Sequence, residues 1–177
     1  LTQWLEEWRV VGHRTRAAAL VRVVGSLLMG AKLALTQLGR GLRCGGLVKH
    51  EIKLVDRLLG NRRLHAERLG IYRALAAALL SGVDRPVVVV DWADFELSRK
   101  WLMLKAAVPL GGRAFSVYER VFPFKQYNSP GAHRQFLREL HEVLPEGCRP
   151  IVVTDAGFRG PWFREVESYG WDWVGRV

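Results

Sequence analysis

Two short runs of β-branched residues, VVVV at 87–90 and IVVT at 151–154, constrain the fold of this chain more than any other feature. Continuous apolar runs of this length are typical of strands buried inside a sheet. An acid follows each run at once, Asp91 after the first and Asp155 after the second. An acid at the end of a buried strand is either a satisfied structural group or a ligand of a metal ion.

The elements around these two runs predict an α/β fold. Strands are expected at 87–94, 101–110, 113–122, 150–154 and 171–176, with helices that start at Ser129-Pro130 and at Pro161. Gly111-Gly112 is expected to close a hairpin. The order β-β-β-α-β-α-β is that of a ribonuclease-H-like mixed sheet, in which a helical crossover lets the fourth strand lie parallel beside the first.

Residues 1–83 are predicted to form an all-helical region ahead of the α/β region at 84–177. One helix is expected around 17–28, a short one at 33–42 with Thr36 as N-cap and then interrupted by glycines, and two more at 50–61 and 64–80. The first apolar stripe is Ala17, Leu20, Val21, Val24, Leu27 and Leu28. Short helices with a basic outer face suit a helix-turn-helix layout or an ordinary helical bundle.

Positive charge is concentrated in the first half of the chain. Residues 1–86 carry 15 Lys and Arg against 6 Asp and Glu, whereas residues 87–177 carry 12 against 11. A basic region of this kind indicates an anionic partner, usually nucleic acid, or a solvated basic face that only aids solubility. The residues expected to contact DNA are Lys49, Lys53, Arg57, Arg62 and Arg63.

Other sequence features argue for a cytoplasmic protein with no membrane partner. Cys44 and Cys148 lie far apart and belong to no C-x-x-C pair, which argues against a disulfide framework or a zinc site. The longest uncharged runs, such as 74–83, are about half of what a membrane span needs. The apolar stretch at 21–35 is broken by Arg22 and Lys32 and lacks the layout of a secretory signal.

Asp91 and Asp155 are expected to share a metal ion if their strands are parallel neighbours. Neighbouring strands lie about 4.8 Å apart, and Mg²⁺ is commonly held by one or two carboxylates with water and substrate phosphate. The alternative is that Asp91 caps a turn and Asp155 forms an Asx turn before Gly157.

Several nearby polar and aromatic residues are expected to have structural roles. Asp94 lies at odd spacing from Asp91, so it is interpreted, with Glu96, as a turn or salt-bridge residue. His133 and His141 are interpreted as surface residues. Trp92 and Trp162 are expected near the site, where either could form its wall.

The chain resembles DDE-type transposases of bacterial insertion sequences, and more narrowly the insertion-sequence-four family near its insertion-sequence-ten members. The matching pieces run in family order from about residue 33 onward. They are LTQLGRGL, KHEIKLVDRLLGNRRLHAER, VVVVDWADF, GRAFSVYERVFP, IVVTDAGFRGPWF and GWDWVGRV. The resemblance implies a ribonuclease-H-like core in which Asp91 matches the first catalytic acid and Asp155 the second, both binding Mg²⁺ or Mn²⁺.

The same resemblance implies binding to the terminal inverted repeats, cleavage of the DNA strands, joining to target DNA and a homodimer on DNA in the bacterial nucleoid. The family's third acid is a Glu within a Tyr-Arg-Glu-Lys signature, and Glu165 and Glu167 do not match it. We therefore expect a core truncated before that helix. Three interpretations stay open: a transposase, a DNA-binding fragment without catalysis, and an α/β domain whose acids only cap turns.

Overall fold

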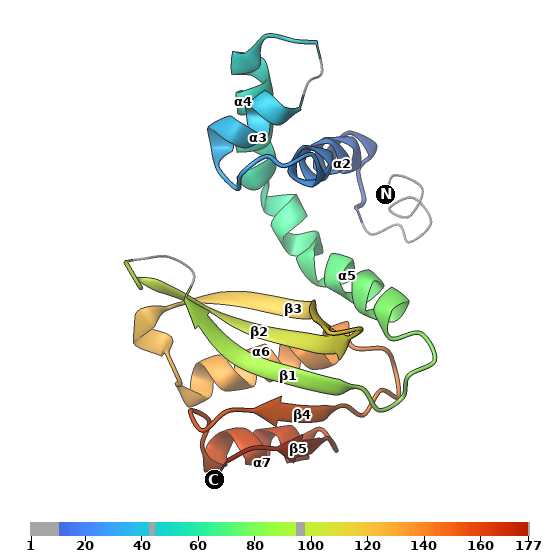
Figure 1. Cartoon of the computed structure of the whole chain (residues 1–177), viewed down its shortest axis with the longest axis vertical. Helices are drawn as coiled ribbons and strands as arrows, with labels where there is room; N and C mark the ends of the chain where they lie inside the picture. Colours follow the sequence, from blue (N-terminus) through green and yellow to red (C-terminus); the bar gives the residue numbers. More distant parts are fainter. Residues whose placement is uncertain (1–10, 43–44, 95–97, 177) are drawn as a thin grey trace. The chain divides into compact units, whose positions relative to one another are not determined.

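The computed structural model describes residues 11–42, 45–94 and 98–176 of the 177-residue chain. The chain divides into two compact units, Leu1–Ile71 and Tyr72–Val177. The division falls inside one long helix, α5 (Arg62–Leu79). The first unit is helical, and the second is an α/β unit built on one sheet (Figure 1). Cys44 and Glu96 lie outside the described residues.

The sheet of the second unit has five strands in the order β3-β2-β1-β4-β5. Its strands are β1 (Val87–Asp94), β2 (Trp101–Leu110), β3 (Arg113–Pro123), β4 (Ile151–Thr154) and β5 (Asp172–Val174). β1 pairs antiparallel with β2 and parallel with β4. The predicted α/β class and the predicted parallel pairing of the first and fourth strands are therefore confirmed.

The tight turn between β2 and β3 depends on two glycines. Gly111 and Gly112 both have positive φ, 57° and 74°, which glycine adopts without the steric cost that a Cβ brings. This two-residue connection pairs Leu110 with Arg113, and the ladder then runs to Trp101 opposite Pro123, with one register shift at Ala106/Ala107.

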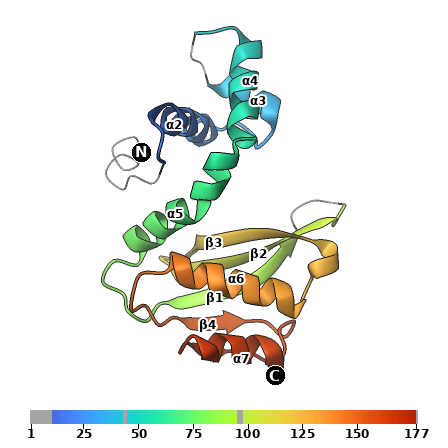
Figure 2. The ribbon, with the colours of Figure 1, turned by 180° about the vertical axis from the view of Figure 1, so that it is seen from behind.

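Two helices cover one face of the sheet (Figure 2). They are α6 (Pro130–Val143) and α7 (Gly160–Ser168). Ser129 caps α6 as predicted, because its Oγ accepts a hydrogen bond from the Ala132 N–H at 3.2 Å. The predicted apolar face of α6 is buried in full: Ala132, Phe136, Leu137, Leu140, Val143 and Leu144. On α7, Phe163 stacks against Trp173 of β5 with ring centroids 4.1 Å apart.

The alternation of β1 separates a buried face from an exposed one. Val88 and Val90 are completely buried, whereas Val87 and Val89 are each 40% exposed. Because successive residues of a strand point to opposite faces, Val87, Val89 and Asp91 share the face that α6 and α7 leave uncovered in the described part of the chain. Asp91, one of the two acids expected to bind a metal ion, therefore lies on the side of the sheet that α6 and α7 do not cover.

In the described part of the helical unit, four helices pack around a small core. They are α2 (Arg14–Leu28), α3 (Leu35–Gly41), α4 (Val48–Leu59) and the first part of α5. The core consists of Val23, Leu38, Val55 and Leu58. Asn61 caps α5, since its Oδ1 accepts from the N–H groups of Arg63 and Leu64. No helix among the described residues is both long and apolar enough to cross a membrane.

Three predictions in the helical unit are wrong. Thr36 does not cap α3, because the N-cap is Ala34 and Thr36 lies inside the helix. Leu28 is 81% exposed, and Val23 occupies the core in its place. Gly39 and Gly41 do not interrupt α3 but lie within it. A Cβ on Gly39 would lie 2.7 Å from the Ile52 Cα of α4, so glycine is needed there for close helix contact.

Candidate metal edge and basic cavity

Asp91 lies within β1, one position after the buried Val90. Its side chain is exposed and has no hydrogen-bond or ion-pair partner among the residues that the structure describes. The alternative role, in which Asp91 caps a turn, is therefore not supported by any side-chain hydrogen bond among the described residues. The carboxylate is available to bind a ligand from the open side of the sheet.

Asp155 follows the last residue of β4 directly. Its Oδ1 accepts a hydrogen bond from the Gly157 N–H at 2.9 Å, which is the Asx turn expected as the alternative role. A Cβ on Gly157 would lie 3.0 Å from the same oxygen, so the turn favours glycine at this position. One bond to Oδ1 leaves further acceptor sites on the carboxylate, so the Asx turn and metal binding are compatible.

The register of the parallel strands brings the two acids to the same edge. Val90 of β1 is paired with Thr154 of β4, and Asp91 and Asp155 each come one residue later. Backbones of paired strands are about 4.8 Å apart, so two carboxylates at this edge are within reach of one cation. Two carboxylates are hard oxygen donors of the kind that Mg²⁺ and Mn²⁺ prefer, and the donor set therefore fits the ion that the resemblance implies.

A row of charged residues continues from Asp91 across the antiparallel strands. Asp91 is paired in register with Lys105 of β2, which is paired in turn with Glu119 of β3. Lys105 Nζ lies 3.8 Å from Glu119 Oε1, and Ser116 Oγ donates to the same oxygen at 2.6 Å. The sequence offered no signal for this row, because it depends on the strand register. The row places the ammonium group of Lys105 beside the sheet edge that carries Asp91 and Asp155.

Two other acids of the α/β unit, Asp94 and Glu167, have partners of their own. Asp94 accepts from the Arg99 Nε at 3.1 Å, which confirms its interpretation as a salt-bridge residue. Glu167 accepts from the Trp173 indole at 2.9 Å, and Glu165 lies on the same helix. Within the described residues, no group of three or more His, Cys, Asp and Glu side chains is arranged to hold a metal ion.

The interpretation of His133 as a surface residue is wrong. It is only 6% exposed, and burial lowers its pKa from 6.5 to about 4. The reason is that its ring is enclosed by aromatic rings, with the centroid of Trp162 at 5.0 Å and that of Phe158 at 5.4 Å. His141 is exposed as predicted. The same helix, α6, thus carries one buried, neutral imidazole and one that meets solvent.

The two tryptophans expected to form a wall lie in one aromatic cluster. The centroid of Trp92 lies 5.7 Å from Phe122 and 6.2 Å from His133, and His133 in turn contacts Trp162. Trp162 is 1% exposed. The cluster packs beneath the edge that carries Asp91 and Asp155, on the face that α6 and α7 cover.

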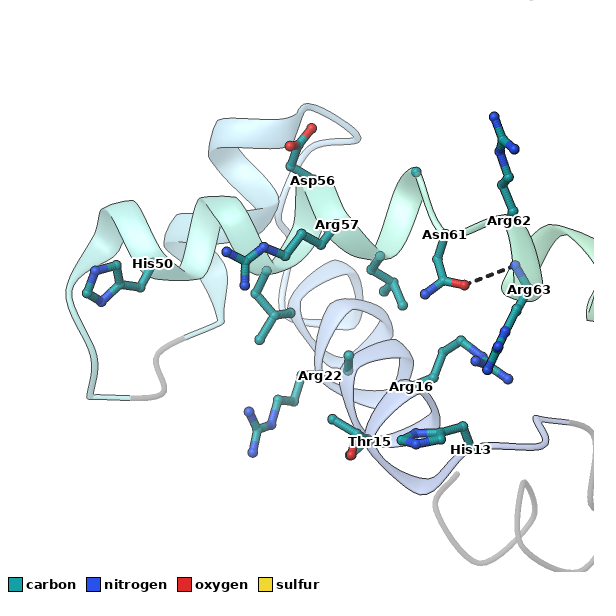
Figure 3. A pocket seen from close by; sticks show the side chains of 15 residues that line it. His13, Thr15, Arg16, Arg22, His50, Asp56, Arg57, Asn61, Arg62 and Arg63 are labelled. Carbon is teal, nitrogen blue, oxygen red and sulfur yellow. Dashed lines mark hydrogen bonds between the residues drawn. The ribbon is translucent and has the colours of Figure 1, made fainter.

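A large cavity lined by cations lies in the helical unit (Figure 3). Its volume is about 1110 Å³, and the apolar residues on its lining include Ala18, Ala19, Leu54 and Leu58. The charged residues on its lining are Arg16, Arg22, Arg57, Arg62, Arg63 and Asp56. Arg22 extends from α2 and Arg57 from α4, so both walls contribute a guanidinium. Arg16 is also paired with Glu67 of α5.

The structure brings together some of the expected DNA-contacting residues. Arg57, Arg62 and Arg63 all line the cavity. Lys49 and Lys53 are exposed and precede Arg57 at spacings of four, so the three form one stripe along α4 beside the cavity. Sequence reasoning missed Arg22, because a lone arginine between valines carries no periodic signal.

Comparisons of the chain with protein-family models, with curated proteins and with solved structures found no match.

Proposed function

We propose that the chain is a DDE-type transposase of the insertion-sequence-four family, with a ribonuclease-H-like core behind a DNA-binding helical unit. The single observation that carries the proposal is the register of β1 and β4, which puts Asp91 and Asp155 at one sheet edge. The strand order β3-β2-β1-β4-β5 supports it, because this order with a parallel β1 and β4 is that of the proposed fold.

Asp91 and Asp155 would hold Mg²⁺ or Mn²⁺ at this edge. In phosphodiester cleavage such ions stabilise charge on the attacking and leaving oxygens and help to generate a hydroxide nucleophile. The chain's own contribution is to fix the two acids. The β1 ladder holds the backbone of Asp91, and the Gly157 N–H orients the Asp155 carboxylate. The resemblance also implies a third catalytic acid, a Glu. We assign no residue of this chain to that role.

The basic cavity and the stripe beside it would bind the phosphate backbone of double-stranded DNA. Arg57, Arg62, Arg63, Lys49 and Lys53 supply cations at this surface. Such contacts are independent of sequence and weaken steeply with salt. The bound DNA would be the inverted-repeat ends and the target, with two copies of the chain acting as a dimer in the bacterial cytoplasm.

A second candidate function is DNA binding without cleavage. The observation in its favour is that the basic cavity lies entirely within the helical unit and uses neither carboxylate. On this view the chain recognises the ends of the element but does not cut them.

One experiment tests both candidates. Cleavage of an inverted-repeat duplex is measured with Mg²⁺ in this chain and in a longer chain that carries the third acid, each with and without Asp155→Ala. Loss of cleavage in the variant is expected, whereas cleavage that survives the change rules out the assigned site. Binding to DNA that is strong at low salt, without cleavage by either chain, supports the second candidate. Absence of binding at low salt rejects both.

A further inference from the structure

Two large aromatic side chains are exposed next to each other at one end of the sheet. They are Phe124, in the short helix η1 (Phe124–Gln126), and Tyr127, which follows it. Phe124 is 50% exposed and Tyr127 is 46% exposed. Their rings are parallel to within 6°, with centroids 6.2 Å apart. Burial of such rings is strongly favourable, so a pair left half in solvent indicates a surface that a partner covers. We call this pair the aromatic platform.

Backbone hydrogen bonds fix the aromatic platform to the sheet. The Phe124 N–H donates to the Lys100 carbonyl at 2.8 Å, and the Tyr127 N–H donates to the Phe124 carbonyl at 2.9 Å. The Tyr127 ring also packs against the Trp92 ring of β1, with centroids 5.4 Å apart. Both rings are therefore held in place before a partner binds, which lowers the entropy that binding costs.

The aromatic platform lies at the end of the sheet that carries Asp91. Trp92, which Tyr127 contacts, directly follows Asp91 in β1. β3 ends directly before η1, and its last residue is paired with the first residue of β2. Figure 1 shows η1, in light orange, at the end of the sheet where β1 finishes. A nucleic acid strand held at the proposed metal edge would therefore have these rings close by.

The charges beside the aromatic platform favour a polyanion over an apolar protein surface. Segments 98–104 and 121–130 contain three cations, Arg99, Lys100 and Lys125, and no Asp or Glu. Arg99 is paired with Asp94. Lys100 and Lys125 are exposed and have no ion pair among the residues that the structure describes. Flat rings next to cations are the combination with which proteins bind unpaired bases and the phosphates between them.

We propose that the aromatic platform binds single-stranded nucleic acid. Unpaired bases stack on the rings of Phe124 and Tyr127, and the ammonium groups of Lys100 and Lys125 contact the phosphates. Every base has a flat π-face, so such binding depends little on sequence. Binding of a single strand stands without the proposed function. Only the source of the strand rests on it, as an unpaired stretch of the DNA held at the metal edge.

The contribution of the bases is tested with the full chain and two labelled strands of equal length. One strand is an oligothymidine, and the other has the same sugars and phosphates without bases. Fluorescence anisotropy is expected to show roughly tenfold tighter binding of the oligothymidine, because only its bases can stack. Cations elsewhere on the chain contact both strands alike and leave this ratio unchanged. Equal affinity for the two strands overturns the proposal.

Substitution of the rings is expected to remove the preference for a strand with bases. Phe124→Leu with Tyr127→Leu keeps apolar side chains and both lysines, so only the affinity for the oligothymidine is expected to fall. Phe124→Leu alone, at a half-exposed position, is expected to lower the ratio of affinities in part. Tyr127→Phe keeps the ring and is expected to keep the ratio. An unchanged ratio in Phe124→Leu and in the double variant overturns the proposal.

The matched control for the rings is Phe115→Leu. Phe115 is 43% exposed and lies on β3, where it is paired with Val108 near the turn that joins β2 and β3. This is the end of the sheet opposite to the aromatic platform. The variant is expected to keep the tenfold ratio. A loss equal to that of Phe124→Leu would show that exposed aromatic area in general, and not the aromatic platform, binds the bases.

The role of the lysines is tested through the salt dependence of binding. Lys100→Gln and Lys125→Gln each remove one phosphate contact, so the slope of log affinity against log salt is expected to fall by about 0.7 for each, with either strand. Arg138→Gln, an exposed arginine of α6, is the control and is expected to keep the slope. Unchanged slopes in both lysine variants contradict the assignment of the phosphate contacts.

A contact between copies of the chain is the other use that two exposed rings suit. In that case Phe124→Leu lowers self-association in sedimentation and leaves the affinity for both strands unchanged, which overturns the proposal. None of these measurements uses metal, cleavage or an inverted-repeat duplex. Failure of the proposed transposase activity is therefore recognised separately from failure of the aromatic platform to bind a single strand.

Discussion

Asp91 and Asp155 stand one residue beyond Val90 and Thr154, which are register partners on neighbouring parallel strands. Their side chains differ in what they already contact. Asp155 accepts a hydrogen bond from the Gly157 N–H, whereas Asp91 has no side-chain partner within the described residues. One of the two acids is thus oriented in advance by its own turn, and the other is held only by its strand.

Substitution of either acid is expected to weaken metal binding at the edge. Asp91→Asn and Asp155→Asn each replace a carboxylate by an amide of the same shape, and the amide at position 155 keeps an Oδ1 that can accept from Gly157. Because Mn²⁺ prefers charged oxygen ligands, each change is expected to weaken Mn²⁺ binding about tenfold or more. Electron paramagnetic resonance of free Mn²⁺ measures this directly.

The matched control for these variants is Asp94→Asn. Asp94 lies on the same strand but is paired with Arg99, so its loss is expected to leave Mn²⁺ affinity unchanged. The double variant Asp91→Asn with Asp155→Asn removes both carboxylates from the same ion, so it is expected to bind Mn²⁺ more weakly than either single variant. Loss of one of two bound Mn²⁺ ions in each single variant, with the other bound as before, would show two separate sites.

Arginines on both walls of the basic cavity are expected to contribute to DNA binding. Arg22→Gln and Arg57→Gln each remove one phosphate contact, so the slope of log affinity against log salt is expected to fall by about 0.9 for each. Fluorescence anisotropy of a labelled duplex at several salt concentrations gives the slope. Arg40→Gln, an exposed arginine of α3 outside the cavity, is expected to keep the slope of the unsubstituted chain.

The buried His133 is expected to make stability depend on pH. Its pKa is about 4 in the folded chain against 6.5 when exposed, so the unfolded chain binds more protons between these values. The contribution of the neutral ring to the free energy of unfolding is therefore fully present above about pH 6.5. It falls, by on the order of 2 kcal/mol, as the pH drops towards 4. Urea unfolding from pH 7 to pH 4 measures this loss.

Two substitutions separate the contribution of His133 from that of other groups that bind protons at acidic pH. His133→Gln is expected to flatten the pH dependence, because glutamine does not titrate. His141→Gln is expected to keep it, because His141 is exposed. Identical pH profiles for His133→Gln and the unsubstituted chain would contradict the assignment.

A buried charged pair joins β3 to α6. The Glu139 carboxylate accepts hydrogen bonds from the Arg120 Nη1 and from the Tyr118 hydroxyl, and Glu139 is 8% exposed. Glu139→Leu alone leaves a partly buried arginine unpaired and is expected to cost about 3 kcal/mol of unfolding free energy.

The double variant Arg120→Met with Glu139→Leu tests whether pairing is the cause. It is expected to be more stable than Glu139→Leu alone, since an apolar pair replaces the ion pair and no charge is left without a partner. Thermal and urea unfolding measure the difference. A double variant that is less stable than the single one would show that packing, and not charge, decides the loss.

The core of the second unit was predictable because its signals are local and repeated. Four valines in a row predicted β1, and the Ser129-Pro130 pair with an apolar stripe predicted α6. Both acids could be placed at one edge, since parallel strands end together. The row through Lys105 and Glu119 could not be predicted, because it depends on a register between β2 and β3 that shifts at Ala106/Ala107.

The helical unit was harder to predict, for physical reasons that particular residues show. α3 has seven residues, too few for a periodic signal, and its N-cap Ala34 makes no side-chain bond that would mark the start. In the second unit, His133 was misplaced because the rings that enclose it come from segments distant in the sequence. In each case tertiary packing, and not local pattern, decided the outcome.

The contact between Gly39 and the backbone of Ile52 has a consequence for how the helical unit can vary. An alanine at position 39 would act as a wedge, since its methyl group has to displace a main chain and not a flexible side-chain tip. The wedge would displace α4, the helix that carries Arg57 on the lining of the basic cavity. A glycine without a charged group therefore helps to set where a cationic side chain stands.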